Sequence, residues 1–130
     1  MNKVILILLL FFFSFSSKVF AKPVQGLASW YSSKECSKIN KKKGCPTASG
    51  KSIYELERKH IRFAASNKYR FGTRLKITNR KNLRHTTVII TDRGPNKRFK
   101  KRIIDLSQRA FSDLATPKNG LIPVQIEVIS

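Results

Sequence analysis

The chain contains seven carboxylic side chains that could give or take a proton, and Asp92 stands out among them. It follows the most apolar strand pattern of the chain, residues 86–91, and begins the turn Asp92-Arg-Gly-Pro95. Functional side chains often lie where a rigid element gives way to a loop, and the end of a strand is such a place. Asp92 is therefore our candidate for general acid–base chemistry. The structural alternative is an Asp that only accepts backbone hydrogen bonds in the turn before Gly94.

A second group of titratable side chains lies in the segment Glu55-Leu-Glu-Arg-Lys-His60. Its charge spacing is typical of an exposed helical turn with ion pairs worth a few tenths of a kcal/mol. The alternative is that Glu55, Glu57 or His60 loops back into a cleft. Asp105 is expected to brace the corner between a strand and a helix. Three further titratable residues are expected to face solvent: His85, Asp113 and Glu127.

The only two cysteines, Cys36 and Cys45, flank a lysine-rich segment. We expect a disulfide between them, because an oxidising compartment favours one and the closed loop would be stabilised by roughly 2.5 to 3 kcal/mol. Two cysteines and two distant histidines supply too few ligands for a metal site, so no metal is expected.

The elements that must position these residues are mainly strands. Period-two alternation or short apolar runs predict five strands and one short helix, capped by Ser107 and ended by Thr116-Pro. The strands are expected at residues 26–31, 74–79, 86–91, 103–106 and 121–129, and the helix at 107–115. Residues 36–52 are expected to form a surface loop, and 79–85 a hairpin loop. Several short strands with one helix favour a small closed β-barrel, which leaves no exposed strand edge.

Residues 1–21 have the features of a signal peptide. Lys3 precedes an apolar run over residues 4–13, and Val19-Phe-Ala21 is a small-residue cleavage site. The run is too short for a membrane span, which needs about 20 apolar residues. Residues 22–130 are therefore expected to be an exported domain, periplasmic or associated with the cell wall. No cysteine lies near the junction, so no lipid anchor is expected.

The chain is strongly basic, with 27 Lys and Arg against 7 Asp and Glu and a formal net charge of +20. Removal of residues 1–21 takes away only Lys3 and Lys18, so the charge belongs to the mature domain. Such a charge attracts polyanions over long range, in a way that salt weakens. Anionic wall polymers are possible partners of an exported domain. The basic stretch 97–102 could hold such a polymer, although such stretches are usually solvated surface.

Five short motifs in order resemble the signature set of the rare lipoprotein A (RlpA-like) family. They are Ala28-Ser-Trp-Tyr31, Thr47-Ala-Ser-Gly50, Phe71-Gly-Thr73, Thr91-Asp-Arg-Gly-Pro95 and Ile103-Ile-Asp-Leu-Ser107. The resemblance covers residues 26–128, and it implies a six-stranded double-psi β-barrel. It also implies a lytic transglycosylase of peptidoglycan, acting in cell-wall remodelling or daughter-cell separation, without a cofactor.

Such an enzyme cuts a glycosidic bond without water. A carboxylic acid protonates the leaving oxygen, and the 6-hydroxyl of the same sugar attacks the anomeric carbon to close a 1,6-anhydro ring. One carboxyl group can act as acid and then as base, whereas a hydrolase needs a pair at a fixed separation. By resemblance, Asp92 falls on a catalytic acid of the family. Arg93 and the net charge favour its ionised form, so burial would have to oppose them for it to hold a proton.

The chain departs from the family pattern at two positions. Lys51 stands where an acid usually follows the Ala-Ser-Gly turn, and Ser66 stands where a His usually follows the Ala-Ala pair. Glu55, Glu57, His60 or Ser66 would have to support catalysis instead.

Four residues are candidates for binding a substrate. Trp30 and Tyr31 could stack on sugar rings or fill the barrel core. Thr47 could bond a glycan or only its own turn, and Arg93 lies beside the candidate acid.

We expect the protein to be a monomer. Three functions remain: a lytic transglycosylase, a noncatalytic peptidoglycan-binding module with the same cleft, and a cationic effector acting on membrane or nucleic acid. The third is disfavoured because the sequence has no recognisable nucleic-acid module and no long basic amphipathic helix, so no nucleic-acid partner is expected.

Overall fold

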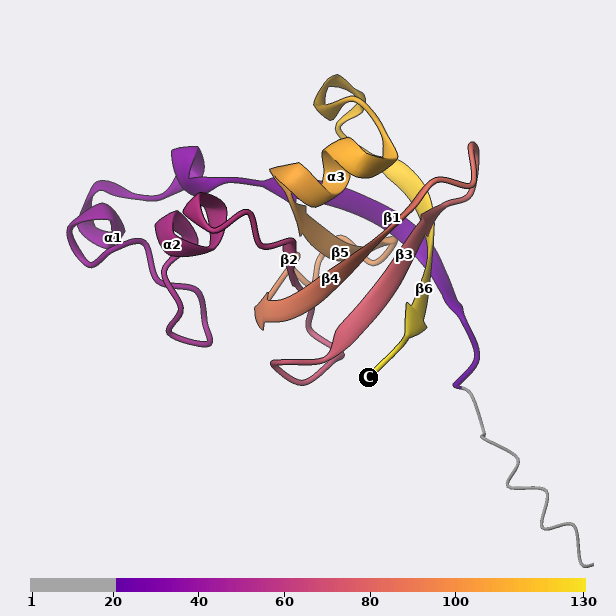
Figure 1. Cartoon of the computed structure of the whole chain (residues 1–130), viewed down its shortest axis with the longest axis horizontal. Coiled ribbons are helices and arrows are strands. Elements are labelled where there is room, and N and C mark those ends of the chain that lie inside the picture. Colours follow the sequence, from indigo (N-terminus) through magenta and orange to yellow (C-terminus); the bar gives the residue numbers. More distant parts are fainter. Residues whose placement is uncertain (1–20) are drawn as a thin grey trace, which may run out of the picture.

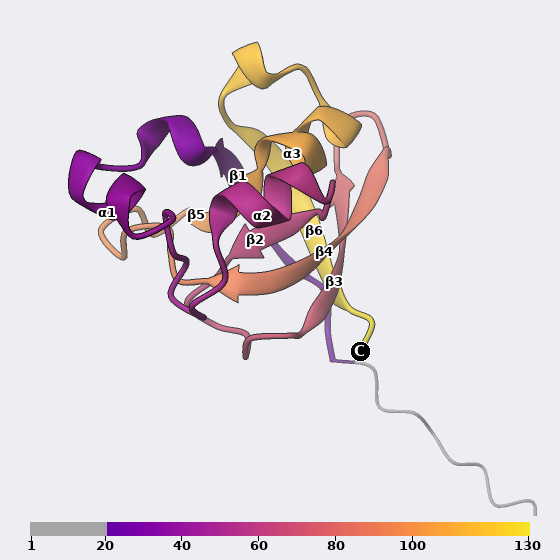
Figure 2. The same ribbon diagram turned by 60° about the vertical axis from the view of Figure 1, so that its left-hand side comes forward.

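The computed structural model describes residues 21–130, so the predicted signal peptide, residues 1–21, falls almost entirely outside the described part. Six strands close into a barrel in the order β1-β5-β2-β4-β3-β6 (Figures 1 and 2). The strands are β1 (Val24–Tyr31), β2 (Phe63–Ala65), β3 (Arg74–Asn79), β4 (His85–Asp92), β5 (Arg102–Ser107) and β6 (Ile122–Val128).

The strand pairing divides the barrel into two equivalent halves. β1 pairs with β5 and β2 pairs with β4 in parallel, and the remaining four pairs are antiparallel. Replacing every strand by the one three places away leaves this set of pairs unchanged. β1 and β4 are therefore equivalent strands, and their last residues, Tyr31 and Asp92, end at the same side of the barrel.

The core follows the predicted alternation. In β3, Leu75 and Ile77 are fully buried while Arg74 is exposed, and in β6 the alternate residues Ile122, Val124 and Ile126 are buried. Burying side chains of this size stabilises a fold by roughly 1.5 to 3 kcal/mol each. The mainly β, six-stranded barrel expected from the sequence is thus confirmed.

The expectation of a single helix is wrong, because residues 21–130 contain three α-helices and two short 3-10 helices. They are η1 (Ser33–Glu35), α1 (Lys38–Lys42), α2 (Ile53–Arg58), α3 (Gln108–Leu114) and η2 (Pro117–Asn119). α3 is the predicted helix, and its N-cap Ser107 accepts a hydrogen bond from the amide of Ala110. α1 lies in the segment expected to be a loop, where Ser37 caps it. β2 was not predicted, because its three residues are all buried and show no alternation of buried and exposed positions.

A second, smaller core holds the helical region beside the barrel. Ile53 and Leu56 of α2 pack with Cys45 and with Phe63 of β2. The predicted disulfide between Cys36 and Cys45 is present, with 6.1 Å between their Cα atoms. In Figure 1, α1 and α2 lie together at one side of the barrel, whereas α3 covers the strands. This disulfide-linked region leads directly into the loop that contacts Asp92.

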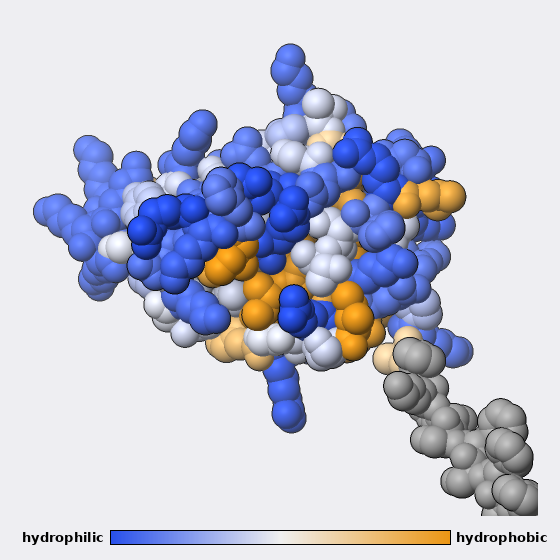
Figure 3. Space-filling view, viewed as in Figure 1, coloured by the Kyte–Doolittle hydropathy of each residue, from blue (hydrophilic) through white to orange (hydrophobic). Residues whose placement is uncertain are grey.

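The surface is dominated by hydrophilic side chains, and apolar residues gather in a patch over the strands of the barrel (Figure 3). Among residues 21–130, no helix has the length and apolar character that a membrane crossing requires.

Candidate functional site

Asp92, the last residue of β4, is held by three donors. Its Oδ1 accepts the amide of Ala48 at 2.8 Å and the amide of Arg93 at 2.9 Å, and its Oδ2 accepts the hydroxyl of Tyr31 at 3.0 Å. An ionised carboxylate only accepts hydrogen bonds, so these donors match its charged form. The bond to the Arg93 amide is the turn bond of the structural alternative. The bonds from Tyr31 and Ala48 come from distant parts of the chain and fix the carboxylate at the rim of the barrel.

The turn at residues 47–50 brings the Ala48 amide to Asp92. The amide of Ser49 donates to the carbonyl of Thr91 at 3.1 Å, which fastens the turn to the end of β4. Thr47 is buried, and its hydroxyl donates to the carbonyl of Lys51 at 2.8 Å within the turn. Thr47 therefore shapes the turn, as the structural interpretation of this residue predicts.

Tyr31 lies among several carboxylates. Its ring packs edge-on against Phe63, with 5.7 Å between ring centroids. Burial first, and then the negative charges of Asp92, Asp105 and Glu57, raise the pKa of Tyr31 far above its ordinary value. Its hydroxyl therefore keeps its proton and acts as a permanent donor toward Asp92.

Asp105 is a second carboxylate of the site that sequence reasoning did not place there. Ala65 of β2 pairs with Asp92 on one side and with Asp105 of β5 on the other. Neighbouring strands are about 4.8 Å apart, so the two Asp Cα atoms are roughly 10 Å apart. Asp105 does not brace the strand-to-helix corner as expected, because it accepts the hydroxyl of Ser29 at 2.6 Å across the β1/β5 pair.

Burial is the main cause that raises the pKa of Asp105 above its ordinary value, and the negative charge of Asp92 acts in the same direction. The hydrogen bond from Ser29 and the positive charge of Arg102 oppose this rise. Asp92 and Asp105 thus sit in unlike surroundings, one with three hydrogen-bond donors and the other partly desolvated. Such a difference between neighbouring carboxylates is the pattern of an acid–base pair.

Arg93 turns away from the carboxylate of Asp92. Its guanidinium donates to the carbonyls of Ser66 and Tyr69, each at 3.0 Å, and stacks on the ring of Phe71 at 3.9 Å. Ser66 is fully buried, and its hydroxyl accepts the amides of Lys68 and Tyr69. Both residues therefore stabilise the loop after β2.

The remaining predicted residues lie elsewhere. Glu55 is exposed and forms ion pairs with Arg58 and Lys59 of its own helical segment. Both carboxylate oxygens of Glu57 accept hydrogen bonds from Ser33. His60 contacts the guanidinium of Arg109.

Trp30 belongs to the core, as one of its two interpretations predicts. Its indole donates to the carbonyl of Pro117 at 2.9 Å, and its ring packs against Phe111. Asp113 was expected to face solvent, but it is half-buried and bonds Arg62 and Thr86. These two partners lower the pKa of Asp113.

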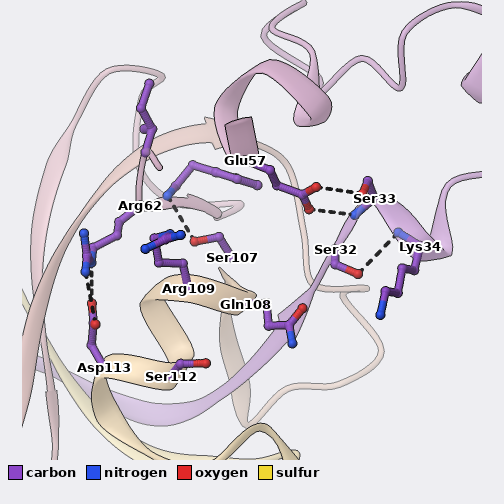
Figure 4. A pocket seen from close by; sticks show the side chains of 12 residues that line it. Ser32, Ser33, Lys34, Glu57, Arg62, Ser107, Gln108, Arg109, Ser112 and Asp113 are labelled. Atoms are coloured by element: carbon purple, nitrogen blue, oxygen red, sulfur yellow. Dashed lines mark hydrogen bonds and ion pairs between the residues drawn. The ribbon is translucent and has the colours of Figure 1, made fainter. Parts of the chain in front are cut away.

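Two cavities lie along the face of β5 that carries Asp105. Side chains alternate along a strand, so Ile103, Asp105 and Ser107 share a face, with about 6.6 Å between successive positions. Ser107 lines a cavity of ≈ 430 Å³ between η1, α2 and α3, which we call the α3 cavity (Figure 4). Ile103 lines a second one of ≈ 280 Å³, which we call the basic cavity. Asp105 lies between Ile103 and Ser107 on the strand.

The α3 cavity has both signs of charge, and its two acids are already bonded. Figure 4 shows Glu57 bonded to Ser33 and Asp113 paired with Arg62, with Arg109 of α3 between them. Among residues 21–130, no group of three or more His, Cys, Asp or Glu side chains gathers in a way that could hold a metal ion.

This barrel topology, with a carboxylate at the end of β4, defines a double-psi β-barrel domain. Residues 23–126 match the family described as "Lytic transglycolase", and the chain belongs to that family.

Several similar proteins are named as endolytic peptidoglycan transglycosylases. The chain is 39% identical over 105 residues to a protein of a Nostoc species named "Probable endolytic peptidoglycan transglycosylase RlpA". It is 38% identical over 106 residues to the Campylobacter jejuni protein named "Endolytic peptidoglycan transglycosylase RlpA". These matches cover 81% and 80% of this chain but only 25% and 33% of the relatives, so the chain spans about a third or less of their length.

Solved structures confirm the fold. An expansin from Clavibacter michiganensis superposes with a TM-score of 0.61 at 20% identity, over 84% of this chain and 51% of the expansin. A Streptomyces papain inhibitor gives a TM-score of 0.61 at 19% identity, over 86% of this chain and 98% of the inhibitor. The same barrel therefore serves proteins of different activities.

Proposed function

We propose that the chain is a lytic transglycosylase that cleaves the glycan strands of peptidoglycan, outside the cytoplasm, and leaves 1,6-anhydro ends. The family and the names of its relatives support this reaction class. The observation that carries the proposal is the pair Asp92 and Asp105 on either side of Ala65, with Asp105 placed on β5 between two residues, Ile103 and Ser107, that line separate cavities.

The two carboxyl groups divide the acid and base work. Asp105, whose pKa is raised, donates its proton to the glycosidic oxygen as the bond from that oxygen to the anomeric carbon breaks. Asp92 stabilises the resulting oxocarbenium-like carbon by its negative charge. It then accepts the proton of the sugar's 6-hydroxyl as that oxygen attacks the anomeric carbon. Exchange with water returns the proton to Asp105, so no proton is gained or lost.

This division of roles removes a difficulty noted from the sequence, namely that Arg93 and the net charge favour the ionised form of Asp92. With Asp92 as the only acid, it would need to hold a proton while three donors point at its oxygens. With Asp105 as the acid, the same donors orient the base. Tyr31 is then a positioning residue, because it acts on the substrate through Asp92.

A noncatalytic peptidoglycan-binding module is the second candidate, and one observation favours it. The two positions at which the family resemblance implies an acid and a His hold Lys51, which is exposed, and Ser66, which is buried in its own turn. A barrel that binds glycan without cutting it would need neither residue.

Mass spectrometry of purified peptidoglycan incubated with the protein tests the proposal. New 1,6-anhydro ends are expected from the wild type, and Asp92→Asn and Asp105→Asn should each lower their rate by about 100-fold or more. Glu55→Gln is the matched control, because it also neutralises one carboxylate but lies on the exposed side of α2. Binding without new ends would select the module, and new reducing ends without anhydro ends would indicate a hydrolase.

A further inference from the structure

The basic cavity combines positive charge with an apolar wall. Four bases line it: Lys68, Lys97, Lys100 and Arg102. The apolar wall consists of Val24, Tyr69, Pro95, Phe99, Ile103 and Ile126. Among the residues that the structure describes, no Asp or Glu lines this cavity. In contrast, Glu57 and Asp113 balance part of the positive charge in the α3 cavity.

Phe99 is the centre of this cationic cluster. The guanidinium groups of Arg98 and Arg102 lie 4.8 Å and 4.7 Å from the centroid of its ring, and the side chain is 40% exposed. Cation–π attraction holds each guanidinium near the ring. Of the two, only Arg102 lines the basic cavity, where a bound anion would offset its charge.

Arg102 carries a hydrogen-bond donor that its neighbours do not use. Its Nε is buried and has no hydrogen-bond partner within residues 21–130. A buried donor without an acceptor costs free energy, commonly about 1 to 3 kcal/mol. A shift of the Arg102 side chain that exposed Nε to the cavity would let a ligand oxygen satisfy it, and a carboxylate accepts several hydrogen bonds at once.

The basic cavity lies next to the carboxylate site, although neither Asp92 nor Asp105 lines it. Ile103 and Asp105 lie on the same face of β5, about 6.6 Å apart along the strand. The loops after β2 and β4, which both begin at the carboxylate site, form another wall, and Asn67 joins them by donating to the carbonyl of Pro95 at 2.7 Å. A chain-like ligand that passes Asp92 and Asp105 would therefore reach this cavity.

We propose that the basic cavity binds a carboxylate-bearing polysaccharide. The four bases take the carboxylate, and the apolar wall with Phe99 takes the face of a sugar ring. The choice of a polysaccharide, rather than another polyanion, rests on the proposed function, because the cavity lies next to the site to which a glycan strand is assigned.

Binding is measured on the Asp92→Asn protein by calorimetry, with oligogalacturonate as the probe and a cello-oligosaccharide of equal length as the neutral comparison. Lys97→Gln/Lys100→Gln should weaken oligogalacturonate binding about 10-fold. Lys41→Gln/Lys42→Gln, which removes the same charge from exposed α1, should weaken it less than about 3-fold, because it alters only the long-range field. Equal losses in the two double variants would overturn the proposal.

The aromatic contribution is tested without a change of charge. Phe99→Ala should weaken oligogalacturonate binding about 5-fold, and Ile39→Ala, at an exposed apolar position on α1, should leave it unchanged. A loss only in the lysine variant, together with tighter binding of poly(glycerol phosphate), would reassign the cavity to phosphate polymers. Preferential binding of phosphatidylglycerol vesicles would reassign it to lipid headgroups.

The binding measurement tests this inference separately from the proposed function, because binding requires no cleavage. A wild type that forms no anhydro ends, but whose variants show the expected binding pattern, would refute the transglycosylase and leave the acidic-glycan site standing. Formation of anhydro ends by a protein that binds no oligogalacturonate would support the transglycosylase and refute the acidic-glycan site.

Discussion

The hydroxyl of Tyr31 donates to Oδ2 of Asp92 at 3.0 Å, and these two residues end the two strands that the internal symmetry of the barrel exchanges. The symmetry brings the two strand ends together at one side of the barrel. The sequence places a donor at one end and an acceptor at the other. The strand pairing of the barrel is therefore symmetric, whereas the side chains of the candidate site are not.

Tyr31→Phe removes this donor while keeping the ring against Phe63. We expect kcat for anhydro-end formation to fall about 10- to 100-fold with KM little changed, because Asp92 loses orientation rather than substrate contacts. Asp92→Asn combined with Tyr31→Phe should lose no more activity than Asp92→Asn alone, because Tyr31 acts through Asp92. A purely structural role would lower the melting temperature and add a further loss in the double variant.

Asp105→Asn should stabilise the folded protein at neutral pH. Burial raises the folded-state pKa of Asp105 above its ordinary 3.8, so the folded state binds this proton more tightly than the unfolded state. The wild type therefore loses stability as pH rises through the interval between these two pKa values. Calorimetry should give the variant a higher melting temperature than the wild type at pH 7, with the difference disappearing near pH 3. A variant less stable than wild type at pH 7 would show that the charged form of Asp105 is favoured in the fold.

Cys36→Ser/Cys45→Ser should lower the free energy of unfolding by about 2.7 kcal/mol, the loop-closure value for ten residues. Urea unfolding followed by tryptophan fluorescence measures this, because Trp30 lies in the barrel core. The Ala48 amide reaches Asp92 through the disulfide-linked region, so activity per folded molecule should also fall. An unchanged urea midpoint would contradict the stabilising role of the disulfide.

Gly26→Ala should destabilise the barrel by about 1 to 3 kcal/mol, because a Cβ there would lie 2.7 Å from side-chain atoms of Ile103 on the neighbouring strand. The loss of stability arises from contact with the Ile103 side chain alone, so a double-mutant cycle between Gly26 and Ile103 checks it. Adding Ile103→Ala should cost less in the Gly26→Ala background than in the wild type. Additive losses would show that the strain arises elsewhere.

Strand positions with one buried face were predictable from the sequence. β3 and β6 follow a period of two, and Ser107 has the side chain and the position of an N-cap. β2 has three buried residues and no polar face, so no periodicity marks it. α1 is held by its cap and the disulfide, and its lysine-rich sequence carries no apolar stripe.

Asp92 was predictable as a candidate because the end of an apolar strand and a turn motif both mark it. Asp105 was not, because its role depends on a neighbour that is distant in sequence: Ala65 pairs with both acids. One local signal existed, since Asp105 alternates with the buried Ile104 and Leu106 and must point out of the core. The loops that bring Ser33 to Glu57 and Arg109 to His60 have no such signal.

The placement of β1 between β5 and β6 sets an order of events for folding. Both partners of the first strand lie near the end of the described chain, so β1 stays unpaired until β5 and then β6 are available. Contacts of such long sequence separation form slowly, because most of the chain must be gathered before they stabilise it. A chain with this connectivity becomes a closed barrel only after its last strand is available. If residues 1–21 direct secretion as the sequence predicts, the topology itself keeps the protein in a form that can be exported.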